Sequence, residues 1–115
     1  MTADDAQHER RLAWEERVLA RAVGEVEARS ELELRVATAE AMRGVYSPRR
    51  SSGAFRAYCD AVQARAKWQR AHGPGPVSDA AAVELEALTS AVENAAQHHD
   101  VVLARRRVVL DRPPN

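Results

Sequence analysis

The sequence predicts an all-α protein, a three-helix coiled-coil-like bundle with long first and third helices and a shorter second helix. Gly, Pro and Ser residues concentrate in two short stretches, 44–53 and 72–79, which divide the chain into three segments. In each segment apolar residues recur at steps of three and four, the period of a helix rather than of a strand. We expect one helical domain over 1–115, with a disordered tail at 112–115 and helices over about 3–43, 53–72 and 78–111.

The first predicted helix is the longest. No proline interrupts residues 3–43, and Thr2 followed by Asp5 fits a capping box at its start. Acidic and basic side chains alternate every four residues over 21–33, as on a solvated helix face. Gly24 is the position at which this helix is expected to break, if it breaks at all. One continuous apolar stripe follows this helix and comprises Leu12, Leu19, Val23, Val26, Ser30, Leu34, Ala37 and Ala41.

The second predicted helix is short and rich in positive charge. It covers residues 53–72, and Ser51 or Ser52 is available as its N-terminal cap. Basic side chains occupy much of its surface. The remaining side is a modest apolar stripe of Phe55, Tyr58, Cys59, Val62, Ala66 and Gln69.

The third predicted helix has the most regular pattern. Ser78 precedes it as an N-cap, and Asp79 places a negative charge in the first turn, where the helix dipole favours one. Two polar residues, His99 and Arg106, interrupt its heptad seam. A polar seam residue fixes register and partner, so we expect both to face glutamates of the first helix or of a second chain. The seam comprises Leu85, Leu88, Val92, Ala95, His99, Val102, Arg106 and Val109.

The tripeptide His98-His99-Asp100 resembles a chemical site more than any other stretch does. Adjacent helical positions are about 100° apart, so the two histidines cannot chelate one ion as residues at i and i+4 do. Alanines stand three residues before each histidine, where a ferritin-like di-iron site needs glutamates. The sequence also lacks a Gly-rich phosphate loop and a nucleophile motif. We therefore assign no catalytic residue, metal, cofactor or small-molecule substrate, and expect a protein that is not an enzyme.

The composition predicts a thin core. Apolar residues make up 45% of the chain, but 23 of its 115 residues are alanine and only 4% are aromatic. Burial stabilises by about 25 cal/mol per Å² of apolar area, so an alanine-rich core of this size favours support from a partner chain. The single cysteine, Cys59, fits a reducing compartment. No apolar run reaches the length of a signal or spanning segment, so we expect a cytoplasmic protein without membrane contact.

Unequal helix lengths predict exposed apolar turns at two places. In an up-down-up arrangement the short second helix leaves part of the first helix and the end of the third uncovered, including Val101, Leu103, Val108 and Leu110. Such patches mark interaction surfaces, and a two-fold dimer would cover both. We therefore predict a non-catalytic interaction, adaptor or assembly module that binds a second copy or another protein. Its predicted interface comprises Leu12, Trp14, Val18, Leu19, His99, Val102, Arg106 and Val109.

The charge distribution supports a second hypothesis. The net charge is zero, yet residues 1–42 hold ten acidic and six basic side chains, while 43–72 hold seven basic ones against Asp60 alone. These segments either attract one another, within a bundle or between chains, or the basic middle faces phosphate. The alternative function is therefore nucleic-acid binding through Arg49, Arg50, Arg56, Arg65, Lys67 and Arg70.

Overall fold

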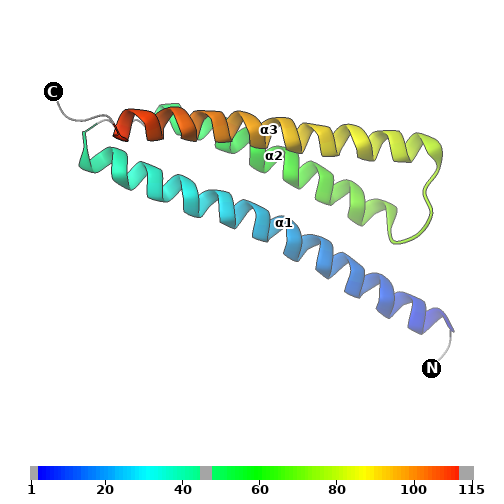
Figure 1. The fold of residues 1–115 in the computed structure, drawn as a ribbon. Helices are drawn as coiled ribbons and strands as arrows, with labels where there is room; N and C mark the ends of the chain where they lie inside the picture. Colours follow the sequence, from blue (N-terminus) through cyan, green and yellow to red (C-terminus); the bar gives the residue numbers. More distant parts are fainter. Residues whose placement is uncertain (1–2, 45–47, 112–115) are drawn as a thin grey trace.

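The computed structural model confirms the all-α fold with three helices (Figure 1). It describes the backbone of residues 3–44 and 48–111, and the side chains of residues 3–44 and 53–106. Over this part of the chain it contains no strand. The predicted cap at Thr2 and the predicted tail at 112–115 lie outside the described residues.

The three helices are unequal in length, with 40, 25 and 33 residues: α1 spans Ala3–Met42, α2 spans Pro48–His72 and α3 spans Asp79–Asp111. The first helix runs without a break through Gly24. The second begins at Pro48, five residues before the predicted start, because a proline is well tolerated in the first turn of a helix. Ser51 and Ser52 therefore lie within α2 and do not cap it.

The helix ends follow ordinary capping chemistry. Gly44, two residues after the end of α1, and Gly73, directly after α2, adopt positive φ angles of 74° and 70°, a conformation that glycine accepts without a steric penalty. At the start of α3 the backbone N–H of Ala81 donates to Ser78 Oγ at 3.2 Å. The predicted N-cap at Ser78 is thus confirmed.

The α2 and α3 helices run antiparallel and side by side, and α1 packs on them mainly through its C-terminal half (Figure 1). Towards its N-terminus α1 diverges from the other two helices, and the chain termini lie at opposite ends of the molecule. The molecule measures 71 × 30 × 19 Å, and its radius of gyration is 18.9 Å. A compact domain of this length would have a radius of about 13 Å. The fold is therefore elongated.

The core consists of two small clusters. One joins Tyr58 and Val62 of α2 to Val92 of α3 and is bordered largely by alanines. The other joins Val36 of α1 to Leu103 of α3. Both clusters are small because alanine side chains fill much of the space between the helices.

The packing faces of α2 and α3 agree with the sequence pattern. In α2, Tyr58, Val62 and Ala66 are buried, and the other members of the predicted stripe are half-buried. In α3, every seam member from Leu85 to Arg106 is buried or half-buried. The last seam residue, Val109, has a side chain outside the described part of the chain. The heptad pattern of α3 therefore identified its packed face.

Candidate functional site

Helix α1 carries two apolar rows, and only one of them packs against the bundle. The packed row includes Val18, Ala22 and Val36. The other row, which the sequence identified as the apolar stripe, is mostly open and lies about one residue, or about 100°, around the helix from the packed row. The expected exposure of Leu12 and Leu19 is thus confirmed. The exposed large apolar side chains of this row, with their exposed fractions, are Leu12 at 46%, Leu19 at 39%, Val23 at 54% and Leu34 at 67%.

Ion pairs between helices explain this rotation of α1. Glu25 accepts a hydrogen bond from Arg65 of α2 at 2.6 Å, and Arg29 pairs with Asp100 of α3. The prediction that Glu25 and Arg29 lie on a solvated face is therefore wrong. Because a buried or half-buried charge is costly without a partner, the positions of these basic and acidic side chains fix which face of α1 packs.

His99 lies in the middle of the bundle with no exposed surface. The Phe55 ring lies 5.5 Å from the imidazole centroid, and neither ring nitrogen has a hydrogen-bond partner within the described part of the molecule. Burial lowers the pKa of His99, and the charges of Arg29, Arg106 and His98 lower it further. His99 is thus a neutral core residue and does not face a glutamate.

Arg106 pairs with the first helix of the same chain. Its Nε lies 3.1 Å from Glu40 Oε1, and both side chains are almost fully buried. We expected Arg106 to face a glutamate of the first helix or of a second chain, and the contact with Glu40 is the first of these alternatives. The last turns of α1 also cover Leu103, which packs on Val36, so the expectation that Leu103 is exposed is wrong.

An apolar groove of about 580 Å³ lies between the open row of α1 and the adjacent side of α2. Its floor is formed by Val26 of α1 and by Val62 and Ala66 of α2, with Leu19 and Val23 along its α1 wall. The rims carry opposite charges: Glu27 on α1, and Lys67 and Arg70 on α2. The groove therefore combines an apolar floor with a charged, polarised border.

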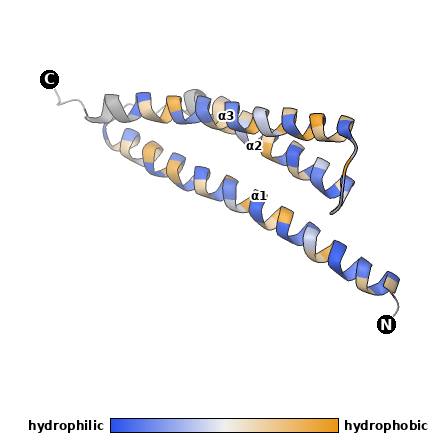
Figure 2. Ribbon diagram, turned by 45° about the vertical axis from the view of Figure 1, so that its right-hand side comes forward, coloured by the Kyte–Doolittle hydropathy of each residue, from blue (hydrophilic) through white to orange (hydrophobic). Residues whose placement is uncertain are grey.

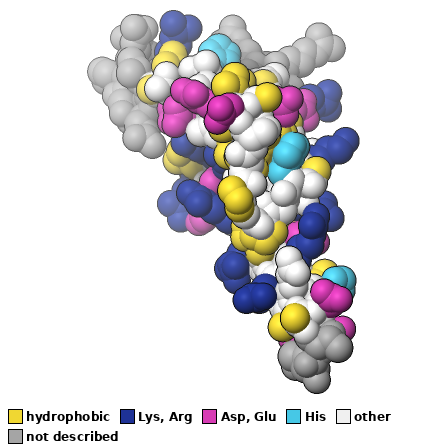
Figure 3. Space-filling model, turned by 90° about the vertical axis from the view of Figure 1, so that its right-hand side faces the viewer, with side chains coloured by type: hydrophobic (Ala, Val, Ile, Leu, Met, Phe, Trp, Pro, Cys, Tyr) yellow, Lys and Arg dark blue, Asp and Glu magenta, His cyan; other side chains and the backbone are white. Residues whose placement is uncertain are grey.

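Two views show how widely the apolar side chains are spread. Hydrophobic positions recur along the whole α1 ribbon, including the part that diverges from the bundle (Figure 2). On the face seen in Figure 3, hydrophobic side chains form patches bordered by Lys and Arg. Apolar surface on this molecule is therefore not confined to the interface between helices.

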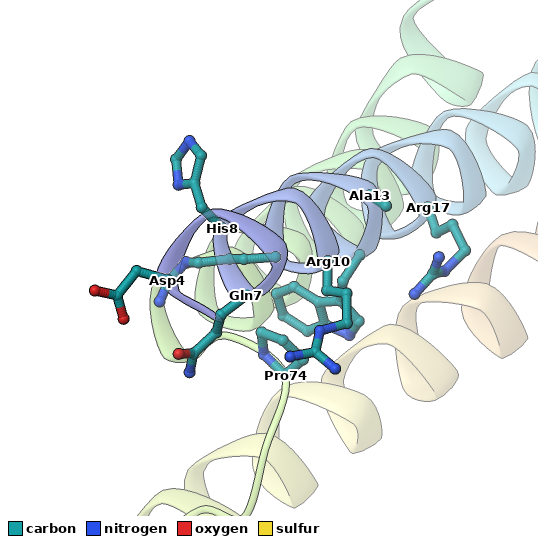
Figure 4. Close-up of a pocket in the computed structure, with 9 residues that line it drawn as sticks. Asp4, Gln7, His8, Arg10, Ala13, Arg17 and Pro74 are labelled. Atoms are coloured by element: carbon teal, nitrogen blue, oxygen red, sulfur yellow. The ribbon is translucent and has the colours of Figure 1, made fainter. Parts of the chain in front are cut away.

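A second hollow, of about 680 Å³, lies where α1 diverges beside the α2–α3 turn (Figure 4). Arg10 and Arg17 extend from the same side of α1 into it, whereas His8 points to the opposite side. Trp14 and Pro74 also line it. Its charged side chains are exposed, so it is a shallow basic surface and not an enclosed site.

The remaining predicted interface residues have mixed positions. Trp14 and Val18 are half-buried at the packed side of α1, and Val102 is half-buried in α3. Of the eight residues of the predicted interface, Leu12 and Leu19 belong to the open row. Sequence reasoning missed Val23, Leu34 and Glu27 as site residues, although the spacing of the row was the signal that could have identified them.

The residues predicted to bind nucleic acid also divide into two groups. Arg65 is half-buried and paired with Glu25. Arg56, Lys67 and Arg70 are exposed, and with Gln63 they form a row along α2 at steps of seven, four and three. The side chains of Arg49 and Arg50 lie outside the described residues. Three basic side chains on α2 are thus free to meet an external acidic group.

Other signs of chemistry are limited. Burial raises the pKa of the Cys59 thiol, and the nearby Asp60 and Glu33 carboxylates raise it further, so a reactive thiolate is disfavoured. Among the described residues, no three His, Cys, Asp or Glu side chains cluster as metal ligands would. None of the described helices is both long and apolar enough to cross a membrane. No family model, curated protein or solved structure matches this chain.

Proposed function

We propose that this protein is a non-catalytic assembly module that binds a second copy of itself through the open row of α1. One observation carries the proposal: Leu12, Leu19, Val23 and Leu34 are large apolar side chains exposed in line on one helix. The apolar groove with α2 borders this row. Several large apolar side chains exposed on one side of a helix are typical of an interaction site.

A second copy is a suitable occupant because the surface is itself helical. Amphipathic helices bind apolar grooves through residues at steps of three, four and seven, and the open row of α1 has this spacing. In a two-fold dimer the same surface is used on both copies, so each row can enter the groove of the other. The thin core and elongated shape leave apolar area that such pairing would bury.

The mass of the pure protein in solution tests this proposal. We expect sedimentation at micromolar concentrations to give twice the 12.7 kDa of the chain. The double variant Leu19→Gln, Val23→Gln should sediment as a monomer with unchanged helicity, since both residues are exposed. Val83→Gln is the matched control, because Val83 is 65% exposed on α3 and should not affect the mass.

Two outcomes would contradict the proposal. The first is a wild-type protein that remains monomeric at about 100 µM. The second is a double variant that associates as tightly as the wild type. Because burial of apolar area drives the association, the dimer should persist at high salt.

The exposed basic row on α2 supports nucleic-acid binding as a second candidate function. Arg56, Lys67 and Arg70 present three positive charges along one side of the helix, a spacing suited to backbone phosphates. Binding of DNA or RNA that weakens steeply with salt, and is lost when these three become glutamine, would support this candidate. Self-association without such binding would contradict it.

A further inference from the structure

We infer that the second copy lies antiparallel on the first, with the two-fold axis at Val23 and the acidic edge of each α1 beside the basic row of the other α2. This arrangement rests on the proposed self-association. It adds a register, an orientation and a set of charge pairs that can each be tested separately.

The apolar side chains set the register. The α1 wall of the groove runs from Leu19 to Glu27, so Val23 is at its middle. The two outermost large apolar side chains of the open row, Leu12 and Leu34, are each eleven residues from Val23. An antiparallel pair centred on Val23 therefore places Leu12 of one copy opposite Leu34 of the other.

Contacts inside one chain show which residues of α2 lie beside each part of α1. Arg65 meets Glu25, and Arg29 lies over the Tyr58 ring at 5.4 Å. The two helices are antiparallel, and in these two contacts the numbers of the facing residues sum to 90 and 87. By this relation Lys67 lies at the level of α1 residues 20–23 and Arg70 at the level of residues 17–20, and both line the groove with Leu19.

The acidic edge of α1 then meets the basic row of the partner. In the antiparallel register, Glu27 of the second copy lies at the level of Leu19, and hence beside Lys67 and Arg70. Glu16 of the second copy lies at the level of Ser30, which corresponds to α2 residues 57–60, within about one turn of Arg56. On a helical wheel both glutamates are on the side of the open row away from Ala22, the residue that faces α2. They therefore point towards the other copy.

A parallel pair would not have this complementarity. In a parallel register, Glu27 of the second copy would stay at its own level, which on α2 is the level of residues 60–63. It would then lie beside Asp60 and Gln63 in place of Lys67 and Arg70. A carboxylate at an interface is unfavourable without an opposite charge, so the position of Glu27 favours the antiparallel orientation.

Cysteine cross-linking tests the orientation. Leu12→Cys and Leu34→Cys are placed separately in a Cys59→Ser background, and the two proteins are oxidised alone and mixed. In the antiparallel dimer, identical positions are about 33 Å apart along the axis, since a helix rises about 1.5 Å per residue. A disulfide needs Cα atoms within about 7 Å. We expect a cross-link in the mixture and none in either protein alone.

The control for this experiment is Ala28→Cys in the same background. Ala28 is exposed on α1 but lies away from the open row, so it should not cross-link with either variant. If Leu12→Cys alone cross-links as fast as the mixture, the orientation is parallel and the inference is wrong. If neither the mixture nor the single variants cross-link, the register is wrong.

Charge exchange tests the pairing of edges. One protein carries Glu27→Lys, and the other carries Lys67→Glu with Arg70→Glu; all three positions are exposed. In each homodimer both edges become repulsive, so we expect Kd to rise roughly tenfold or more. In the mixed dimer both edges are complementary again. The mixture should therefore associate within about threefold of the wild-type Kd.

The outcomes separate this inference from the proposed function. A wild-type protein that is monomeric contradicts both. A wild-type dimer whose charge variants associate as tightly as the wild type contradicts the edge pairing alone. Circular dichroism of each variant shows that its helices remain formed, so that a loss of association reports on the interface.

Discussion

The two halves of α1 have similar compositions but different environments. Both alternate apolar and charged residues, yet no described side chain of residues 3–24 is buried, whereas Val36 and Glu40 of the C-terminal half are. The two halves differ in the surface that lies opposite each of them. The C-terminal half faces Leu103 and Arg106 of α3, while the N-terminal half diverges from the bundle. An amphipathic pattern therefore shows that a helix can pack, but the opposite surface determines where it does.

The ion pairs of α1 follow the same division. Glu40 pairs with another helix in a buried setting, and so orders tertiary structure. Arg11 pairs with Glu15 one turn along its own helix, with the Arg11 side chain half exposed. Local pairs of this kind contribute about 0.2–0.5 kcal/mol, far less than the loss caused by stranding a buried charge.

The largest expected effect comes from breaking the buried pair in the packed half. Arg106→Ala leaves Glu40, whose side chain is 4% exposed, without its partner. We expect a loss of about 3–5 kcal/mol in the free energy of unfolding, measured by urea denaturation. Arg11→Ala, the matched change in the open half, should cost less than about 0.5 kcal/mol.

A double variant sharpens this interpretation. Glu40→Leu together with Arg106→Leu removes both charges, so the stability should return to about the wild-type value or exceed it. If Arg106→Ala alone were harmless, the contact would be incidental, and the ion pairs would not explain which face of α1 packs.

The next effect compares two valines. Val62 is 1% exposed, and Val62→Ala should lower the free energy of unfolding by about 2 kcal/mol through lost burial and a cavity. Val23→Ala, in the open row, should change it by less than about 0.5 kcal/mol in a monomeric sample. Equal losses in dilute samples would mean that the open row is packed within the monomer.

A smaller effect is expected at Gly24, where the two halves meet. An alanine side chain there would have no neighbour within 4 Å, and the residue lies inside a continuous helix. Gly24→Ala should therefore raise the free energy of unfolding by up to about 1 kcal/mol. A loss of stability would show that α1 bends at this position.

The most gradual expected effect is a pH dependence of the free energy of unfolding, caused by the protonation of His99. Its folded pKa is lowered below the ordinary value of 6.5 by burial and by Arg29, Arg106 and His98. The unfolded chain therefore takes up a proton more readily, and stability should fall as pH drops below 6.5 towards the folded pKa. Urea denaturation should show that the free energy of unfolding falls more between pH 7.5 and pH 5.5 for the wild type than for the His99→Leu variant. Equal losses would place His99 in contact with water.

Much of the fold could be predicted because its determinants are local. Gly44, Gly73 and Ser78 mark helix ends through backbone conformation and capping, which depend on a few neighbouring residues. The α3 seam was identified because its apolar residues form one row. The start of α2 at Pro48 was missed because Ser51 and Ser52 offered an equally good local cap.

The open site could not be predicted in the same way. Helix α1 has two apolar rows, and periodicity cannot distinguish the row that packs from the row that remains exposed. The choice depends on Arg65 and Arg106, which lie 40 and 66 residues away from their glutamate partners in the sequence. The charges on Glu25 and Arg29 made that face appear solvated, although it is the face that packs on α2 and α3.

The short connections between successive helices have a kinetic consequence. Five residues separate α1 from α2 and six separate α2 from α3, whereas Arg29 and Asp100, which join α1 to α3, are 71 residues apart. Because the entropic cost of closing a loop grows with its length, the contacts between successive helices should form before those between α1 and α3. Helix α1 should then dock from its C-terminal half, so its first turns would be the last to gain protection from amide hydrogen exchange and the first to lose it.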